Sequence, residues 1–469
     1  MAIRGTKIRD QSPVFRTTSY HCWMRSFAPL LILLTLGTSA IARADERPNV
    51  VVFFMDDLGY GDLAIDGAPD VKTPHLDKLA REGVRLTHCY AAAPVCTPTR
   101  AALMTGRYQH RVSIENVIAP SLGNNDQGLS ADEPSLPRYL KDAGYATGLV
   151  GKWHLGSLPA FHPNRHGFDE FFGFLGGAVN YYSHLGEDGE HDLWENDRPV
   201  VVETYLTDEI TARAVSFIER HAGEPFFLDV SFNATHWPFH PPGLETAPEH
   251  PPGGEADVLR HWAGEGTRED YVRMLERADE GIGRILSTLD RLGMRNNTLV
   301  IFASDNGGEW LSRMGPLFQR KRSLHEGGLR VPCILRWPAQ LKGRRVSTQP
   351  AITMDLTATI LHAARARVSK EHPLDGIDLV ALLNGNELVD RTFFWRGVRA
   401  RNEKAVRDGR WKYIADSPIV PGMLFDVVAD PGERLDLAAK HPEIMKRLAD
   451  KHRDWERMVR PEPAAPGDR

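Results

Sequence analysis

The chain has 469 residues, of which 57 are Lys or Arg and 62 are Asp or Glu, and its formal net charge is −5. Hydrophobic residues make up 42% of the chain, which excludes a mainly disordered protein, and Gly and Pro are scattered without the period of a collagen-like repeat. Four cysteines are too few for a disulfide-built scaffold. The length favours two domains, or one large domain with an appendage.

The negative charge lies in the body of the chain. Residues 1–44 contain six basic residues and one acidic residue, so they carry +5 and the remainder carries −10. An acidic body argues against nucleic acid or an anionic membrane as a general partner, and we predict neither. An anionic substrate is still compatible with this charge, because a pocket can be basic locally.

Residues 1–44 are predicted to be a signal peptide. Arg25 precedes the apolar run Phe27–Leu36, and Ala42-Arg43-Ala44 follows as an A-x-A cleavage pattern. The run is short for a bilayer span, so an uncleaved anchor or a buried helix is the weaker alternative. We expect export to the periplasm or the extracellular space, or to the lysosome in a eukaryote, without stable membrane association. Met1 and Met24 are both candidate start residues.

Export would leave an odd number of cysteines, namely Cys89, Cys96 and Cys333. An odd count in an exported protein indicates either a free thiol or a cysteine that has been chemically changed. The residues alone do not decide between these two interpretations.

Buried strands alternate with amphipathic helices over most of the chain. The run Asn49–Met55 is continuously β-branched and aromatic, which is typical of a strand buried on both faces. Further strands are predicted at Tyr145–Val150, Phe226–Ser231, Leu299–Ser304 and Val331–Arg336. Helices are predicted at Thr73–Glu82, Ser135–Ala143, Tyr205–His221, Asp270–Leu292 and Met354–Arg365. This alternation predicts an α/β fold with a large, doubly wound mixed sheet flanked by helices.

The last part of the chain has a different pattern. Short strands are predicted at Arg391–Val398, Glu403–Arg407, Trp411–Ala415 and Leu424–Asp426, before a terminal helix at about His441–Met458. Their spacing predicts a small antiparallel sheet with a helix packed on it. We therefore predict a catalytic domain over residues 45–387 and a C-terminal subdomain over residues 388–469.

Acidic and amide residues follow two of the predicted strands. Asp56 and Asp57 follow the first strand, and Asp305 and Asn306 follow the strand Leu299–Ser304. Their oxygens suit Ca²⁺ or Mg²⁺ and are poor ligands for zinc. Each pair alone could be ordinary turn or cap residues. Because ligands bind beyond the carboxyl ends of the strands in such sheets, their shared position favours a metal site.

A cysteine opens a predicted Ala- and Leu-rich helix at Cys96–Arg107. A helix N-terminus favours negative charge and is expected to lower the pKa of a thiol there. The alternative is a buried structural thiol beside a proline-initiated helix.

Three further loops carry basic residues and histidines. Lys152 and His154 follow one strand and are two residues apart, so in an extended chain both would point to one side. His236 follows the strand Phe226–Ser231, and Lys321 lies in the segment Lys321–Pro332. A lone basic side chain is usually solvated, but these loops could share one edge of the sheet.

These residues resemble the motifs of the type I, formylglycine-dependent sulfatases of the alkaline-phosphatase superfamily. The segment Cys96–Arg100 fits C-x-P-x-R, and Asp56–Asp62, Gly151–Gly156 and Glu326–Pro332 fit three further motifs. The match runs from Arg47 to about Ala438, and four motifs in order argue against chance. The general pattern looks similar to arylsulfatase A and N-acetylgalactosamine-6-sulfatase.

The resemblance implies a sulfuric ester hydrolase that removes sulfate from a sulfated carbohydrate or an aryl sulfate. It implies that a formylglycine-generating enzyme oxidises Cys96 to formylglycine (3-oxoalanine), whose hydrated aldehyde is the nucleophile. That modification would explain the odd cysteine. Whether Cys89 and Cys333 form a disulfide is left open.

The resemblance also implies the roles of the site residues. Ca²⁺, with Mg²⁺ as the alternative, would be bound by Asp56, Asp57, Asp305, Asn306 and the modified Cys96. Arg100 would hold the formylglycine, while Lys152, His236 and Lys321 would contact the sulfate. Lys321 or His236 would protonate the leaving alcohol, and His154 would take the proton that lets the aldehyde form again. The choice of Lys321 over its basic neighbours Arg320 and Arg322 rests on spacing alone.

Three other functions are weighed against this one. The first is a formylglycine-dependent phosphonate monoester or phosphodiester hydrolase, and the second is a non-catalytic protein that binds sulfated glycans. A zinc phosphatase is the weakest, because the Asp and Asn clusters supply no histidine ligands. The sequence does not specify the sugar, the sulfated position, exo or endo action, or the oligomeric state.

Overall fold

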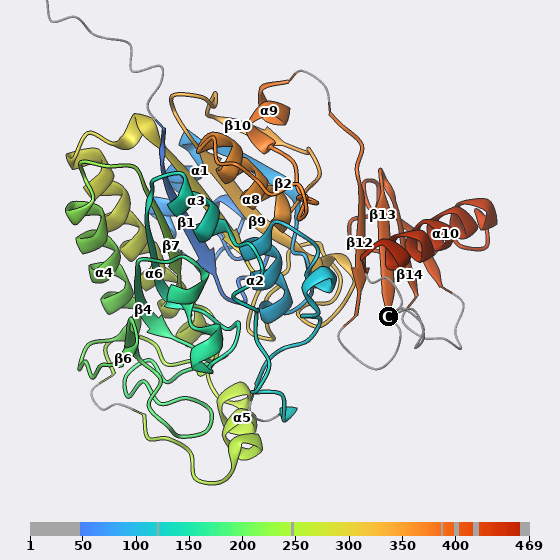
Figure 1. The fold of residues 1–469 in the computed structure, drawn as a ribbon. Coiled ribbons are helices and arrows are strands. Elements are labelled where there is room, and N and C mark those ends of the chain that lie inside the picture. Colours follow the sequence, from blue (N-terminus) through green and yellow to red (C-terminus); the bar gives the residue numbers. More distant parts are fainter. Residues whose placement is uncertain are drawn as a thin grey trace, which may run out of the picture. The chain divides into compact units, whose positions relative to one another are not determined.

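The structure is a computed structural model, and it describes residues 47–119, 122–244, 248–385, 388–397, 403–415 and 422–459. The predicted signal peptide lies outside the described residues. The described part belongs to a single compact unit (Figure 1). No helix in these ranges is both long enough and apolar enough to cross a membrane.

A mixed sheet of 11 strands forms the centre of the molecule, with the order β10-β2-β9-β8-β1-β7-β3-β4-β5-β6 and β11 paired to β2. The strands are β1 Asn49–Met55, β2 Val84–Tyr90, β3 Ala146–Lys152, β4 Glu170–Phe174, β5 Trp194–Glu195, β6 Arg198–Pro199, β7 Phe226–Ser231, β8 Thr298–Ser304, β9 Arg330–Arg336, β10 Arg345–Ser347 and β11 Ala351–Ile352. Strands β8, β1, β7, β3 and β4 are parallel neighbours, whereas β9 runs antiparallel to both β8 and β2. The predicted mixed α/β sheet is therefore confirmed.

Helices cover both faces of this sheet (Figure 1). They are α1 Pro74–Glu82, α2 Cys96–Thr105, α3 Leu136–Asp142, α4 Leu206–Arg220, α5 Glu255–Gly264, α6 Arg268–Arg291, α7 Glu326–Leu329, α8 Thr353–Ala363 and α9 Leu379–Asn384. All five predicted strands and all five predicted helices between them are present, with ends shifted by at most two residues. Sequence analysis did not predict β2, because Arg85, Thr87 and His88 interrupt its apolar run.

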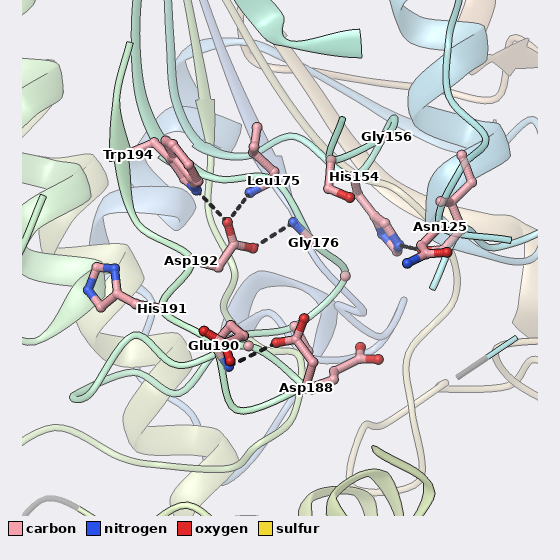
Figure 2. A pocket seen from close by; sticks show the side chains of 16 residues that line it. Asn125, His154, Gly156, Leu175, Gly176, Asp188, Glu190, His191, Asp192 and Trp194 are labelled. Atoms are coloured by element: carbon pink, nitrogen blue, oxygen red, sulfur yellow. Dashed lines mark hydrogen bonds between the residues drawn. The ribbon is translucent and has the colours of Figure 1, made fainter. Parts of the chain in front are cut away.

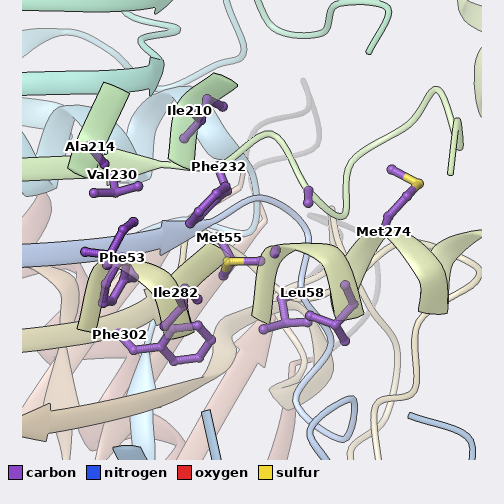
Figure 3. Close-up of a cluster of buried hydrophobic side chains, with 14 of the residues drawn as sticks. Phe53, Met55, Leu58, Ile210, Ala214, Val230, Phe232, Met274, Ile282 and Phe302 are labelled. Carbon is purple, nitrogen blue, oxygen red and sulfur yellow. The ribbon is translucent and has the colours of Figure 1, made fainter. Parts of the chain in front are cut away.

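The two hydrophobic cores follow from the period of a strand, whose successive side chains point to opposite faces. Phe53 and Met55 of β1 pack with α1, α4 and α6 on one face (Figure 3), whereas Val52 and Phe54 pack with α2, α3 and α8 on the other. Since both faces of β1 are covered, its carboxyl end is the place where polar residues can gather.

The C-terminal part is a four-stranded antiparallel sheet in the order β12-β13-β14-β15, followed by a long helix. The elements are β12 Thr392–Arg396, β13 Lys404–Asp408, β14 Trp411–Ala415, β15 Met423–Asp426 and α10 Pro442–Val459. Phe393 and Trp395 of β12 join Tyr90 of β2 and Trp455 of α10 in one buried cluster. The predicted small sheet and helix are present, while the domain boundary at residues 387 and 388 stays a prediction.

Gly151 of β3 allows this strand to approach its neighbour β7 closely. Its φ is +113°, and a Cβ atom there would lie 1.9 Å from the Ser231 carbonyl oxygen. Gly67 offers a matched comparison, because its φ is +97° but a Cβ atom would have nothing within 4 Å.

We predict that Gly67→Ala costs about 1–2 kcal/mol of unfolding free energy through backbone strain alone. Gly151→Ala should cost more than about 4 kcal/mol, because the clash between β3 and β7 is added to that strain. Urea unfolding of both variants measures the difference. Equal costs would show that β3 and β7 can separate without penalty.

Candidate active site

Three buried carboxylates meet where β1 and β8 end. The register pairs Met55 with Ser304, so the residues that follow each strand become neighbours. The Asp57 amide donates to Asp305 Oδ1 at 3.3 Å, and Asn306 Nδ2 donates to Asp57 Oδ1 at 2.6 Å. Asp56, Asp57, Asp305 and Asn306 have no solvent exposure. The structure therefore brings together all four side chains that were predicted from the strand ends.

Each carboxylate is matched by a cation from a different segment. Lys152 Nζ donates to Asp56 Oδ2 at 2.6 Å, and Lys321 Nζ donates to Asp57 Oδ2 at 2.7 Å. Arg100 donates to Asp305 Oδ2 through Nε at 3.1 Å and Nη2 at 2.9 Å. Its Nη1 also donates to Ser231 Oγ at 2.7 Å. Removal of one partner from a buried pair leaves an uncompensated charge, so the three pairs depend on the complete fold.

The structure distinguishes Lys321 from its basic neighbours. Lys321 is 7% exposed and contacts the carboxylate cluster, whereas Arg320 is exposed and donates to the Trp310 carbonyl. Arg322 pairs with Glu309, which also lies 3.8 Å from Lys321. Burial lowers the pKa of Lys321, but Asp57 and Glu309 outweigh it and raise that pKa above its ordinary value. Lys321 is therefore protonated at neutral pH.

The oxygens of the cluster fit a hard divalent cation. Asp56 Oδ1 and Asn306 Oδ1 are buried and have no hydrogen-bond partner in the described structure. Ligand atoms of Asp56, Cys96 and Asp305 lie within 4.8 Å of one another, as do those of Asp56, Asp57 and His236. Burial raises the pKa of Asp56 to about 8, although Lys152 opposes this. A cation would favour the charged form and satisfy both orphaned oxygens, and these ligands suit Ca²⁺ or Mg²⁺.

Cys96 begins α2 at the floor of this cluster and is 2% exposed. Sequence analysis expected the helix N-terminus to lower the thiol pKa, and this expectation is wrong. Burial raises the pKa of Cys96, and the nearby Lys152 and Lys321 only partly oppose that effect. The residue at position 96 is therefore a neutral thiol unless it is modified.

The two histidines of the site are neutral. Burial, reinforced by the neighbouring cations, holds the pKa of His154 and of His236 well below the ordinary value. His154 Nε2 lies 2.9 Å from the Ile118 carbonyl oxygen, which can only accept, so Nε2 carries the hydrogen and Nδ1 is left with a lone pair. The same reasoning places the hydrogen of His236 on Nδ1, 2.6 Å from the Trp237 carbonyl oxygen.

The backbone around His154 differs from the extended chain on which its predicted direction was based. Strand β3 ends at Lys152, and His154 has a left-handed φ of +56°. The two side chains are therefore not related by strand alternation. They reach the site separately, since Lys152 contacts Asp56 and His154 contacts the loop that contains Ile118.

Residues that sequence analysis did not assign anchor the segment that carries Lys321. Lys412 Nζ of β14 lies 2.9 Å from Glu326 Oε1 and 3.1 Å from Glu433 Oε1, and all three side chains are buried. Glu433 Oε2 in turn accepts from the Glu326 amide at 2.6 Å. This ionic cluster ties the C-terminal sheet to the segment Lys321–Pro332. Of its three members only Glu326 stands in a motif named from the sequence, and the contacts join residues that are far apart in the chain.

The remaining cysteines are buried thiols on adjacent strands, Cys89 on β2 and Cys333 on β9. A hydrogen bond that the Cys89 thiol donates to Cys333, together with burial, raises the pKa of Cys89 well above its ordinary value. Of the two states that the sequence left open, the structure has the free thiols.

Comparison with known proteins agrees with this geometry. The sulfatase family model matches residues 48–366, and the model of the C-terminal part of N-sulphoglucosamine sulphohydrolase matches residues 316–457. The chain belongs to the sulfatase family. This sulfatase has the alkaline-phosphatase-like fold of the family and is a sulfuric ester hydrolase.

Relatives cover nearly the whole chain. N-acetylgalactosamine-6-sulfatase of Mus musculus is 32% identical over 90% of this chain and 87% of its own length. N-acetylgalactosamine-6-O-sulfatase of Bacteroides thetaiotaomicron is 31% identical over 86% of this chain and 92% of its own. The structure of Ps i-CgsB in complex with k-i-k-neocarrahexaose is 30% identical, with a TM-score of 0.79 over 87% of this chain and 93% of that one.

We predict that Ca²⁺ raises the melting temperature of this sulfatase, because a cation held by the folded cluster would find no such site in the unfolded chain. A hundred-fold excess over Kd would add about 2.7 kcal/mol, which corresponds to roughly 3 °C for a chain of this length. Differential scanning calorimetry with Ca²⁺ and with a chelator measures the shift. Mg²⁺ provides the comparison ion.

The control for this experiment is a buried carboxylate outside the cluster. Asp56→Asn should abolish the Ca²⁺-dependent shift, whereas Asp355→Asn should keep it, although Asp355 is equally buried and paired with Arg391. A shift that survives in Asp56→Asn would place the ion elsewhere.

Proposed function

We propose that this sulfatase removes sulfate from a sulfated carbohydrate, and that it hydrolyses aryl sulfates, with formylglycine at position 96 and Ca²⁺. The observation that carries the proposal is the position of Cys96. Its sulfur lies within 4.8 Å of carboxylate oxygens of Asp56 and Asp305, and these two carboxylates accept hydrogen bonds from Lys152 and Arg100. A nucleophile at this position would lie beside both ion pairs.

The charge of the cluster suits a monoanionic ester. Arg100, Lys152 and Lys321 balance Asp56, Asp57 and Asp305 one for one, so a divalent cation would leave two positive charges. A sulfate monoester, which carries one negative charge, would be bound with a positive surplus that can stabilise charge developing in the transition state. A phosphate monoester dianion would consume that surplus on binding.

Asp56, Asp57, Asp305 and Asn306 would hold the cation, which supplies charge neutralisation and lowers the pKa of a bound hydroxyl. A formylglycine at position 96 would supply a hydrated aldehyde as the nucleophile. Arg100 holds Asp305 and reaches the Lys152 carbonyl at 3.3 Å, so it fixes the walls around position 96.

Proton transfer is assigned to two groups, one protonated, which can donate a proton, and one neutral, which can accept one. Lys321 is protonated and buried, so it can donate a proton to the leaving alcohol oxygen. Neutral His154 has an unpartnered Nδ1 lone pair, so it can accept the proton from the second hydroxyl of the hydrated aldehyde as sulfate leaves. We assign the sulfate oxygens as contacts of Lys152 and, once its Nε2 is protonated, of His236, because the Nδ1 hydrogen of His236 is donated to the Trp237 carbonyl.

The substrate class is inferred from the relatives, whose names indicate sulfated sugars. We propose that maturation requires a formylglycine-generating enzyme, and that the chain is exported by the segment 1–44. The alternative within the superfamily, a phosphonate monoester or phosphodiester hydrolase, is separated from this proposal by the first experiment below.

We expect protein co-produced with a formylglycine-generating enzyme to hydrolyse an aryl sulfate far faster than the matched phosphodiester or phosphonate monoester. Mass spectrometry of the peptide that contains position 96 should show the aldehyde in place of the thiol. Cys96→Ala should abolish activity and keep the melting temperature within a few degrees. Faster turnover of the phosphodiester, or activity with an unmodified thiol, would overturn the proposal.

A second prediction compares two adjacent basic residues. Lys321→Met should lower kcat/KM for an aryl sulfate by about 10²–10³, because a donor to the developing charge is lost. Arg320→Met should change it by less than about two-fold, since Arg320 is exposed and outside the cluster. The melting temperature of each variant reports any loss of fold. Similar losses in both variants would contradict the assignment of Lys321.

A further inference from the structure

A cavity of about 210 Å³ opens beside His154, on the side of the segment between β4 and β5 (Figure 2). His154 is 2% exposed, lines this cavity and has no partner for Nδ1 in the described structure. A Cβ atom added to Gly177 would lie 2.8 Å from His154 Nε2 and 3.3 Å from Glu187 Oε1. The histidine of the reaction centre and the carboxylate of Glu187 therefore border the same space.

The lining of this cavity is acidic. Four carboxylates line it, those of Glu187, Asp188, Glu190 and Asp192, and none of its described lining residues is Lys or Arg. This differs from the reaction centre, where each carboxylate is paired with a buried cation. The cavity and the reaction centre therefore differ in charge, although His154 borders both.

Three of these carboxylates, those of Asp188, Glu190 and Asp192, have different surroundings. Asp192 accepts from the amides of Leu175 and Gly176 and from Trp194 Nε1, at 3.0, 2.8 and 2.8 Å, so it fixes the wall and the indole ring (Figure 2). Asp188 and Glu190 are exposed at the rim, where the Glu190 amide donates to Asp188 Oδ1 at 3.0 Å. Their remaining carboxylate oxygens can accept hydrogen bonds from a ligand.

An aromatic wall beside several acceptors suits a sugar ring. The half-buried Trp194 offers an apolar surface, and the rim carboxylates accept from hydroxyl or amide hydrogens. A carboxylate or a second sulfate on the same ring would instead meet like charges at close range, which suppresses binding.

We propose that this cavity binds the uncharged part of the sugar that carries the sulfate ester, and that Asp188 and Glu190 reject substrates with a second anionic group there. The inference rests on the proposed function and specifies its substrate class. Neutral sulfated sugars with free hydroxyl or acetamido groups are accepted, and sulfated uronic acids and disulfated rings are disfavoured.

The test uses aryl sulfates of similar shape that differ in charge at the para position, with acetyl, carboxylate or trimethylammonium substituents. kcat/KM is measured for each with wild-type enzyme and with the double variant Asp188→Asn/Glu190→Gln. The quantity compared is the ratio of the cationic to the anionic probe, because intrinsic leaving-group reactivity cancels between the two enzymes. Asp454→Asn, with its side chain 76% exposed on α10, is the matched control.

The ratio should fall by at least about ten-fold in the double variant and stay unchanged in Asp454→Asn. In the wild-type enzyme it should also shrink as salt rises from about 0.01 M to about 1 M, because the Debye length falls from about 30 Å to about 3 Å. The salt series tests the proposal without any substitution.

Two results would overturn this inference: an unchanged ratio in the double variant, or a wild-type ratio that is insensitive to salt. A matching pair of sugars, one monosulfated and one disulfated, extends the test to carbohydrate, where the disulfated ring should be the poorer substrate or inhibitor. Failure of the enzyme to hydrolyse even the acetyl probe, with formylglycine confirmed, would instead count against the proposed function.

Discussion

The pairing of three buried carboxylates with three buried cations is the constraint on which the rest of this sulfatase depends. Asp56, Asp57 and Asp305 have no solvent exposure, and an isolated charge in such surroundings costs several kcal/mol. The compensating cations come from α2, from the end of β3 and from the segment after β8. The cluster is therefore stable only when these separate parts of the chain are assembled.

The sheet explains why the cluster forms where it does. Strand β1 lies between β7 and β8 and is covered on both faces, so polar groups can follow it only at its carboxyl end. The loops after β3, β7 and β8 reach the same edge because these strands are parallel to β1 or to its neighbours. The antiparallel β9 then brings Glu326 and the segment before it back beside β8.

The C-terminal sheet contributes to the site through an ionic cluster of its own. Lys412 and Glu433 hold Glu326, which shares a short segment with Lys321. A substitution in this part of the chain can thus alter the position of Lys321 without contact with substrate. The acidic cavity beside His154 has a different origin, since most of its lining residues come from the segment between β4 and β5.

The sequence by itself predicted the central strands β1, β3, β7, β8 and β9, the small antiparallel sheet, and the polar residues that the structure gathers at one edge of the large sheet. It could do so because buried strands have continuous apolar runs, and because the motif residues lie directly after strand ends or at a helix start. These features are local, so a window of ten residues contains them. Residues with mixed patterns, such as those of β2, were missed for the same reason.

Only the tertiary structure decided which basic residue of Arg320, Lys321 and Arg322 meets a carboxylate, because Lys321 and Asp57 are 264 positions apart. It also decided that the thiol at position 96 has a raised pKa, that His154 departs from an extended backbone, and that Glu187 and His154 line one cavity. Burial and the direction of a side chain depend on every element packed around a residue. A pattern of residues along the chain contains neither the burial of a side chain nor its direction. Both properties determine the charge in the site where a substrate binds.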